Sequence, residues 1–380
     1  MEFIDLKKQY SVLKKDINKN IKTVLDNGNY IMGEEVKTLE KELAEYVGTK
    51  YCATCANGTD ALSIALMCYN VKPGDCVFVP SFTFFSTAEV VSLLGATPIF
   101  VDSMERTFNI DPEKLEKAII KVESEKKLRP RGIIAVDLFG LPADYKLIKK
   151  IATKHQMFLI EDGAQGFGGS IDDKKACSFG DISTTSFFPA KPLGCYGDGG
   201  AIFTDSKELY DLILSLRIHG KGKFKYDNIR IGMNSRLDTI QAAILLAKLK
   251  AFKDYELDNR NKFAYIYTEK LKNYVKIPLI EHNYISSYAQ YTLIFDNEKQ
   301  RDFLQKYLND RNIPTMIYYP KPLHKQAVYK NYDFNLDDLK VSENLSKCVL
   351  SLPMHPYLDG EIVNDICNYV IEGLEAYKNE

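Results

Sequence analysis

The chain has 380 residues, which is more than one ordinary domain needs and enough for one large and one small domain. Lys and Arg (50) nearly balance Asp and Glu (51), so a net charge of −1 argues against nucleic acid or an anionic membrane as partner. There is no run of about 18 apolar residues, as a membrane-spanning helix requires, and the charged residues after Met1 do not form a secretory signal. We therefore expect a cytoplasmic protein that acts on a small molecule.

Two amphipathic helices are predicted at the start of the chain. Apolar residues recur at helical spacing over 6–25, the segment 27–29 interrupts the pattern, and a second pattern runs over 34–46. A short strand follows that contains Cys52 and ends near Cys55. The five histidines lie far from these cysteines in the sequence, so no metal site is predicted, and two reduced thiols in the core are the favoured interpretation.

The next turn, Asn57-Gly58-Thr59-Asp60, precedes a helix predicted over 61–69. Small polar residues at the start of a helix leave backbone N–H groups free at the positive end of the helix dipole. Read alone, the turn favours an ordinary helix cap over an anion site. A strand is then predicted over 77–80, followed by an aromatic cluster that includes Phe84 and by Ser86 and Glu89 at the spacing of a capping box.

Strands and helices continue to alternate along the chain, with strands predicted over 97–101 and 132–136 and helices over 112–127 and 144–155. This rhythm is typical of a mostly parallel sheet with helices on both faces. Sheets of this kind bind ligands at the carboxyl ends of their strands.

The stretch 157–200 carries the strongest chemical signal. The apolar run 157–160 is followed by Glu161 and Asp162, so a buried strand ends at a carboxylate. A second strand, predicted over 181–188 and containing Ser186, leads into a Pro-bracketed turn that holds Lys191. Alone, Asp162 favours a helix cap and Lys191 a solvated lysine. Together they suit pyridoxal phosphate, whose aldehyde forms a Schiff base with lysine while a carboxylate keeps the ring nitrogen protonated.

A basic, glycine-rich segment over 219–225 is either a solvated loop or a flexible cationic contact for a diphosphate. A long helix from Leu237 then leads into the second domain. We predict a large domain over 1–250, including the N-terminal helices, and a small α/β domain over 251–380, with strands over 289–295 and 315–318.

Three motifs resemble the DegT/StrS family of sugar-nucleotide aminotransferases: Glu161-Asp-Gly-Ala-Gln165, Ser186-Phe-Phe-Pro-Ala-Lys-Pro-Leu-Gly194 and Gly197-Asp-Gly-Gly-Ala201. The likeness extends over nearly the whole chain. It implies a pyridoxal-phosphate enzyme of fold type I, an α/β fold with a mostly parallel central sheet and a smaller C-terminal α/β domain.

The resemblance also implies roles for individual residues. Lys191 is the covalent anchor and the general acid–base. The other implied cofactor ligands are Gly58, Thr59 and Ser186 at the phosphate, Phe84 stacked on the ring, Asp162 at the ring nitrogen, Gln165 at the ring hydroxyl, and Asn234 at the phosphate of the other subunit. The implied substrate contacts are Arg236, His324, His219 and Arg230. Sites that need Asn234 from a second chain imply a homodimer with shared active sites.

The resemblance further implies L-glutamate as amino donor. The chain looks most like the branch that aminates C3 of UDP-2-acetamido-2-deoxy-3-oxo-glucuronate for O-antigen or capsule synthesis. A C3 or C4 aminotransferase of a 6-deoxy keto sugar remains an alternative, as does a non-catalytic regulator or sugar-nucleotide binding protein on the same fold. Related dehydratases have histidine in place of the lysine, so Lys191 favours transamination.

Overall fold

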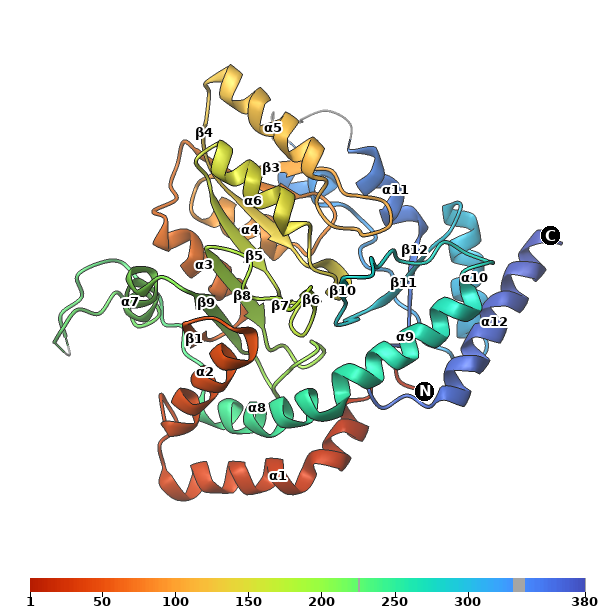
Figure 1. Cartoon of the computed structure of the whole chain (residues 1–380), viewed down its shortest axis with the longest axis horizontal. Helices are drawn as coiled ribbons and strands as arrows, with labels where there is room; N and C mark the ends of the chain where they lie inside the picture. The colour runs from red at the N-terminus through yellow and green to blue at the C-terminus, as the bar shows by residue number, and fades with distance from the viewer. Residues whose placement is uncertain (225, 331–338, 380) are drawn as a thin grey trace.

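The computed structural model describes residues 1–224, 226–330 and 339–379. Within them, seven strands form one central sheet (Figure 1), in the spatial order β1 (Tyr51–Cys55), β9 (Gly200–Thr204), β8 (Ile182–Ser186), β5 (Phe158–Asp162), β4 (Arg129–Val136), β2 (Asp75–Pro80) and β3 (Thr97–Val101). Among these seven, β9 alone runs opposite to the other six. The predicted mostly parallel sheet is therefore confirmed.

Helices cover both faces of this sheet, because successive strand residues point to opposite sides. Ile134 and Ile160 join one core, whereas their neighbours Ile133 and Leu159 join the other. A sheet buried on both faces needs strands that are apolar throughout, as these are. The first face is covered by α3 (Gly58–Cys68), α4 (Ser86–Leu93) and α7 (Lys207–Leu216), the second by α2 (Glu34–Val47), α5 (Pro112–Glu125), α6 (Tyr145–Lys154) and α8 (Thr239–Ala251).

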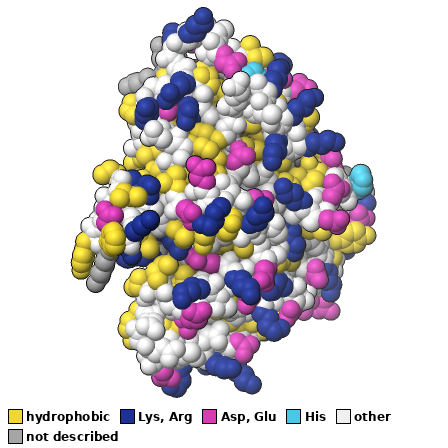
Figure 2. All heavy atoms as spheres, turned by 60° about the vertical axis from the view of Figure 1, so that its left-hand side comes forward, with side chains coloured by type: hydrophobic (Ala, Val, Ile, Leu, Met, Phe, Trp, Pro, Cys, Tyr) yellow, Lys and Arg dark blue, Asp and Glu magenta, His cyan; other side chains and the backbone are white. Residues whose placement is uncertain are grey.

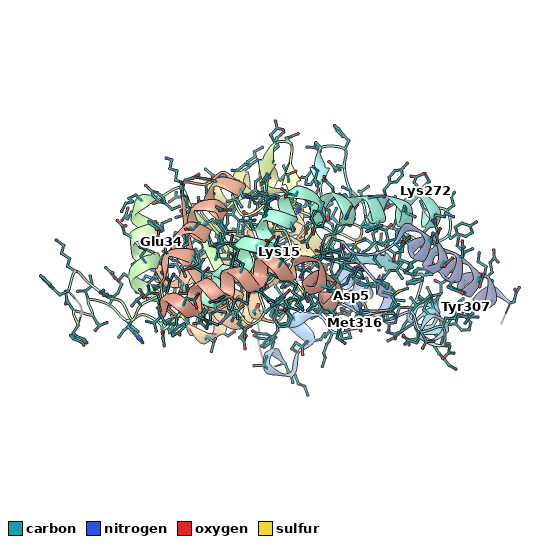
Figure 3. All side chains as sticks on the ribbon, turned by 90° about the horizontal axis from the view of Figure 1, so that it is seen from below. Asp5, Lys15, Glu34, Lys272, Tyr307 and Met316 are labelled. Atoms are coloured by element: carbon teal, nitrogen blue, oxygen red, sulfur yellow. The ribbon has the colours of Figure 1, made fainter. Side chains whose placement is uncertain are left out.

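The first helix, α1 (Leu6–Asn27), lies along α8, as the view from below with Asp5 and Lys15 labelled shows (Figure 3). Asp5 caps it by accepting a hydrogen bond from the backbone N–H of Lys8 at 2.8 Å. Its apolar stripe, which includes Leu13 and Ile17, packs against α8. Both predicted N-terminal helices are present in the structure.

The C-terminal part has a core of its own. The helix run continues without a break from α8 through the π-helical residues 252–256 into α9 (Leu257–Leu271), so the boundary near residue 250 stays a prediction. Around this core lie β11 (Tyr291–Ile294), β12 (Val349–Leu352), α10 (Glu298–Asn309), α11 (Lys340–Cys348) and α12 (Gly360–Lys378), while β6 (Ser170–Ile171), β7 (Lys174–Lys175) and β10 (Tyr284–Ile285) form a small separate sheet.

Two local predictions are wrong. Ser86 is the first residue inside α4 and does not cap it, because the cap residue is Phe85, which makes no side-chain cap bond. The strand expected over 315–318 is reduced to an isolated bridge between Met316 and Ser351. In the described ranges, no helix is long and apolar enough to cross a lipid bilayer.

Candidate functional site

Asp162 is the last residue of β5, at the carboxyl edge of the sheet. Its side chain is buried and accepts hydrogen bonds from the Ala164 N–H at 3.2 Å and from the Thr87 hydroxyl at 3.4 Å. Burial raises the pKa of this carboxyl group, and the positive charge of Lys191 opposes the increase. The carboxylate oxygens of Asp162 can therefore accept a further hydrogen bond from a cationic partner in this buried site.

Lys191 lies on the turn after β8, where its backbone N–H donates to the carbonyl of Phe188 at 2.8 Å. The side chain is half-buried. Burial lowers the pKa of the Lys191 amine, and Asp162 opposes this shift through its charge. A lysine of this kind is neutral more often at physiological pH than a solvated lysine is, which suits a nucleophile.

A phosphate-sized anion would find donors where α3 begins. Asn57 caps α3 by accepting from the Asp60 N–H, and helix geometry leaves the N–H groups of Gly58 and Thr59 without intrahelical acceptors. Ser186, at the end of β8, lies against this turn: a Cβ added at Gly58 would be 2.7 Å from the Cβ of Ser186. Glycine is therefore required for this approach, and the structure brings the start of α3 at Gly58 against Ser186.

The loop after β2 and a distant tyrosine complete this edge. The Phe84 ring is half-exposed, at 53 %, and its centroid lies 6.2 Å from that of Tyr319. The Gln165 side chain donates to the Tyr319 hydroxyl at 3.1 Å and accepts from the Phe139 N–H at 2.6 Å. Gln165 thus lies at the site, but its carbonyl oxygen is already bonded within the chain. Tyr319 and Thr87 were not predicted as site residues, and the hydrogen bonds that place them here join residues distant in sequence.

His324 does not fit its expected role as a substrate ligand. Its Nδ1 is 2.6 Å from the hydroxyl of Ser81, and its Nε2 is 3.1 Å from a carboxylate oxygen of Glu343. Both ring nitrogens are therefore engaged inside the chain. Burial lowers the pKa of His324, while Glu343 opposes the shift. The residue connects α11 to the end of β2 and offers substrate no free nitrogen.

Four predicted residues lie apart from this group. His219 and Arg230 belong to a protruding loop, residues 218–224 and 226–232, which we call the arm (Figure 1, left). His219 is exposed, and Arg230 donates to the Ser215 hydroxyl at 2.5 Å. Just after the arm, Arg236 donates to the side-chain oxygen of the exposed Asn234 at 2.5 Å. Lys225, part of the predicted basic segment, lies outside the described residues.

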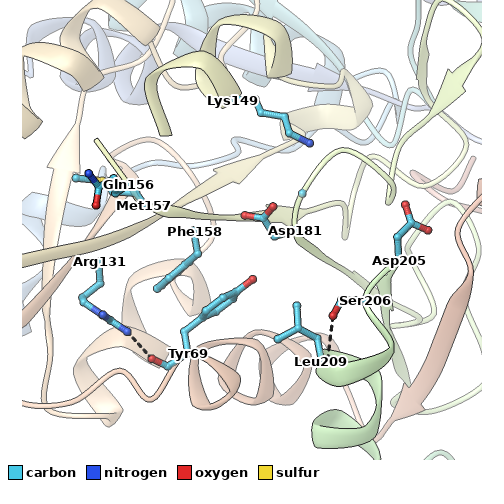
Figure 4. A pocket seen from close by; sticks show the side chains of 11 residues that line it. Tyr69, Arg131, Lys149, Gln156, Met157, Phe158, Asp181, Asp205, Ser206 and Leu209 are labelled. Carbon is cyan, nitrogen blue, oxygen red and sulfur yellow. Dashed lines mark hydrogen bonds between the residues drawn. The ribbon is translucent and has the colours of Figure 1, made fainter. Parts of the chain in front are cut away.

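A large groove of about 620 Å³ lies elsewhere. It is lined by the aromatic pair Tyr69 and Phe158, by Lys149 and by Asp181 (Figure 4). Phe158 begins β5 and Asp162 ends it, so the groove lies at the opposite edge of the sheet from Asp162. Ligands of such sheets bind at the carboxyl edge, which favours the Asp162 group as the site. No group of His, Cys, Asp or Glu suited to a metal ion occurs among the described residues.

The residues at the carboxyl edge fit pyridoxal phosphate. Lys191 supplies an amine with a lowered pKa, and the buried Asp162 has an oxygen bonded only by the long contact to Thr87. The close approach of Gly58 to Ser186 forms a cradle at a helix N-terminus, where a phosphate is stabilised. An amine, a carboxylate and an anion site on three separate elements form the set that this cofactor requires.

Comparisons with known proteins agree with this geometry. The sequence profile of the DegT/DnrJ/EryC1/StrS aminotransferase family matches residues 11–371. A UDP-2-acetamido-2-deoxy-3-oxo-D-glucuronate aminotransferase of Pseudomonas aeruginosa is 48% identical over 368 residues, which cover 97% of this chain and 98% of the relative.

Solved structures show the same fold. A DegT DnrJ EryC1 StrS aminotransferase from Brucella abortus has a TM-score of 0.95 and 49% identity, covering 97% of this chain and 98% of that chain. NtdA from Bacillus subtilis, determined with bound cofactor PMP, has a TM-score of 0.88 and 28% identity, covering 99% of this chain and 85% of that chain.

Proposed function

This chain belongs to the DegT/DnrJ/EryC1/StrS aminotransferase family, and we propose that it aminates a keto sugar carried on a nucleotide. Its cofactor is pyridoxal 5′-phosphate. The observation that carries the proposal is the placement of Lys191 and the buried Asp162 at the carboxyl edge of the sheet, where the charge of each opposes the pKa shift of the other. A protein that only binds sugar nucleotides has no need of an amine and a carboxylate placed in this way.

The side chains divide the work between them. When bound, pyridoxal phosphate supplies an electron sink for the carbon that loses or gains a proton. The Lys191 amine, with its lowered pKa, would take a proton from the Cα of the amino donor in the first half reaction, and would deliver a proton to the sugar carbon that receives the amino group in the second. Asp162 would stabilise the positive charge on the ring nitrogen of the cofactor, and the N-terminus of α3 would hold the phosphate group of the cofactor. Phe84 orients a planar ring through its exposed face.

The substrate we propose is UDP-2-acetamido-2-deoxy-3-oxo-glucuronate, converted to its 3-amino product with L-glutamate as donor for surface polysaccharide synthesis. The P. aeruginosa relative, with 48% identity, bears that activity in its name. The uronate carboxylate needs a cationic partner, and Arg236 supplies a guanidinium group that suits it. A 6-deoxy keto sugar lacks the carboxylate and would not engage this group.

The experiment is an amination assay on the purified protein with pyridoxal phosphate and L-glutamate. We expect the 3-amino product, detected by mass spectrometry, from the 3-oxo-uronate and little product from 6-deoxy keto sugar nucleotides. Arg236→Ala should raise KM for the uronate and leave the reaction with glutamate unchanged. Efficient amination of a 6-deoxy sugar, with no turnover of the uronate, would show that the proposed substrate is wrong and that the proposed amino-transfer reaction is right.

We also propose a cytoplasmic homodimer with shared active sites. All eight cysteines are free thiols, in keeping with a reducing compartment. Three apolar side chains of the arm are exposed: Phe224 at 74 %, Ile229 at 58 % and Ile231 at 87 %. Figure 2, which turns the arm toward the viewer, shows hydrophobic side chains along it. Exposed apolar side chains on a protruding loop support burial of the arm against a second subunit. Asn234 and Arg236 come just after the arm in the chain and would then lie at the same interface.

A complementation experiment tests the shared site. At a uronate concentration well below the raised KM of Arg236→Ala, this variant and Lys191→Ala should each be nearly inactive alone, but in an equal mixture half of the dimers pair the two variants. Each such dimer has one complete site, so the mixture should show about a quarter of wild-type activity. Arg236→Ala paired with Asn234→Ala is the control, because both changes lie beside the arm and no complete site can form. A mixture of the first pair that stays inactive would contradict shared sites.

A further inference from the structure

Two carboxyl groups lie side by side behind the site. Asp137 follows the last residue of β4, Glu161 precedes Asp162 in β5, and both side chains are completely buried. The two carboxyl groups lie close enough that each shifts the pKa of the other. Because successive strand residues point to opposite faces, Glu161 points away from the side on which Asp162 acts. Two neighbouring ionised carboxylates that are both fully buried would repel strongly, so we expect the pair to hold a proton.

The hydrogen-bond donors around Glu161 identify it as the ionised member. One of its oxygens accepts from the Cys177 N–H at 2.5 Å. The other accepts from the Phe179 N–H at 2.6 Å and from the Ser183 hydroxyl at 2.7 Å. Donors on both oxygens stabilise a carboxylate and leave no place for a proton.

Asp137 has the opposite arrangement. Its Oδ1 accepts from the Tyr145 hydroxyl at 2.6 Å and from the Ala143 N–H at 3.1 Å. Its Oδ2 is buried and has no donor among the described residues. A protonated Oδ2 is itself a donor, which accounts for the missing partner.

We propose that Asp137 is protonated at Oδ2, donates this proton in a hydrogen bond to Glu161, and together with Glu161 positions Asp162 and Gln165. The Asp137 N–H donates to the Asp162 carbonyl at 3.1 Å. Gly166 lies directly on the same carboxyl group, since a Cβ added at Gly166 would be 2.3 Å from Oδ2. The pair therefore supports both ends of the turn over 162–166. The positioning role rests on the proposed function, whereas the protonation of Asp137 is independent of that function.

The proton makes stability depend on pH. Burial, followed by the charge of Glu161, raises the pKa of Asp137 well above its usual range. In the unfolded chain this group ionises near pH 4, at about 3.9. The folded form retains the proton, so its contribution to stability is complete below that value and is lost as pH rises through the folded pKa. The other titratable groups that interact with this carboxyl group are Glu161, Tyr145, Cys177 and Tyr284.

The experiment compares denaturant unfolding of wild-type holoenzyme and Asp137→Asn between pH 5 and pH 8. Asparagine keeps an N–H donor toward Glu161 and carries no proton to lose. The ratio of the wild-type to the variant unfolding constant should therefore rise about tenfold per pH unit until the folded pKa is reached. Asp310→Asn, at the exposed end of α10, is the matched control and should show no such slope. If the ratio of the wild-type to the Asp137→Asn unfolding constant does not change with pH, Asp137 is not protonated in the folded protein and the proposal is wrong.

Two further readouts separate the pair's role from its protonation. Infrared spectroscopy of wild-type holoenzyme labelled with ¹³C-aspartate should show the carbonyl stretch of a protonated aspartate at neutral pH, whether or not the variant folds. Asp137→Asn should keep kcat and its pH profile near wild type, and Asp137→Ala should lose about 10- to 100-fold in kcat with little change in KM. Absence of the infrared band overturns the proton. Equal activity of both variants overturns the positioning role.

Discussion

Replacing Lys191 by alanine should abolish amino transfer. The variant loses both the nucleophile and the group that moves the proton, and the loss of general acid–base catalysis alone is about 10²- to 10⁴-fold. Burial lowers the pKa of the Lys191 amine at the carboxyl edge of the sheet, where the charge of Asp162 acts on it. The measurements are the rate of product formation and the visible absorbance of the bound cofactor, which should shift to that of cofactor not linked to lysine.

Lys149→Ala is the matched control for this change. Lys149 is exposed on α6 and lines the groove at the opposite edge of the sheet (Figure 4), so its loss should leave activity near wild type. Wild-type amination by Lys191→Ala would contradict the proposed chemistry. Unchanged function of that variant in cells would support the regulator that the sequence left as an alternative.

Asp162→Asn should lower kcat strongly while keeping the shape of the site. Asparagine occupies the same volume but carries no charge, so a cation next to it in a buried site loses about 3–5 kcal/mol, roughly 10²- to 10⁴-fold in rate. Because the charge of Asp162 raises the pKa of Lys191, the variant should also lower that pKa further. A pH titration of the visible absorbance of the cofactor linked to Lys191 would measure this shift.

Asp198→Asn is the control for the charge change. Asp198 is exposed on the turn that follows Lys191, so its replacement changes the net charge equally without touching the buried pair. We expect near-wild-type rates and no change in the titration. An Asp162→Asn variant as active as this control would show that the buried carboxylate has no role in catalysis.

Much of the fold and part of the site could be predicted from the sequence because the signals are local. The strand that ends at Asp162 is a short apolar run closed by an acid and a glycine, and the structure places it centrally as β5. Gly58 and Ser186 come together because both lie at the carboxyl edge of one sheet, which the alternation of strands and helices already implied.

The rest depends on contacts between residues that are distant in sequence. Tyr319 bonds Gln165 across 154 positions, and no local pattern records that contact. The Pro-Leu pair before His324 does not distinguish a substrate ligand from a structural histidine. Only the folded chain shows that Ser81 and Glu343 engage both of its ring nitrogens. Asp137 was not singled out from the sequence, because only the fold brings it together with Glu161. The capping box at Ser86 failed because the helix boundary falls one residue earlier than its spacing suggested.

The most direct test of the amino-transfer proposal is the visible spectrum of the holoenzyme through one cycle of half reactions. L-glutamate alone should bleach the absorbance of the lysine-linked cofactor, and the 3-oxo-uronate nucleotide should restore it without any other reagent. This return requires that the amino group leave one substrate and enter the other through the site built around Lys191 and Asp162. A holoenzyme whose spectrum does not respond to glutamate or to any other amino donor would contradict the proposal.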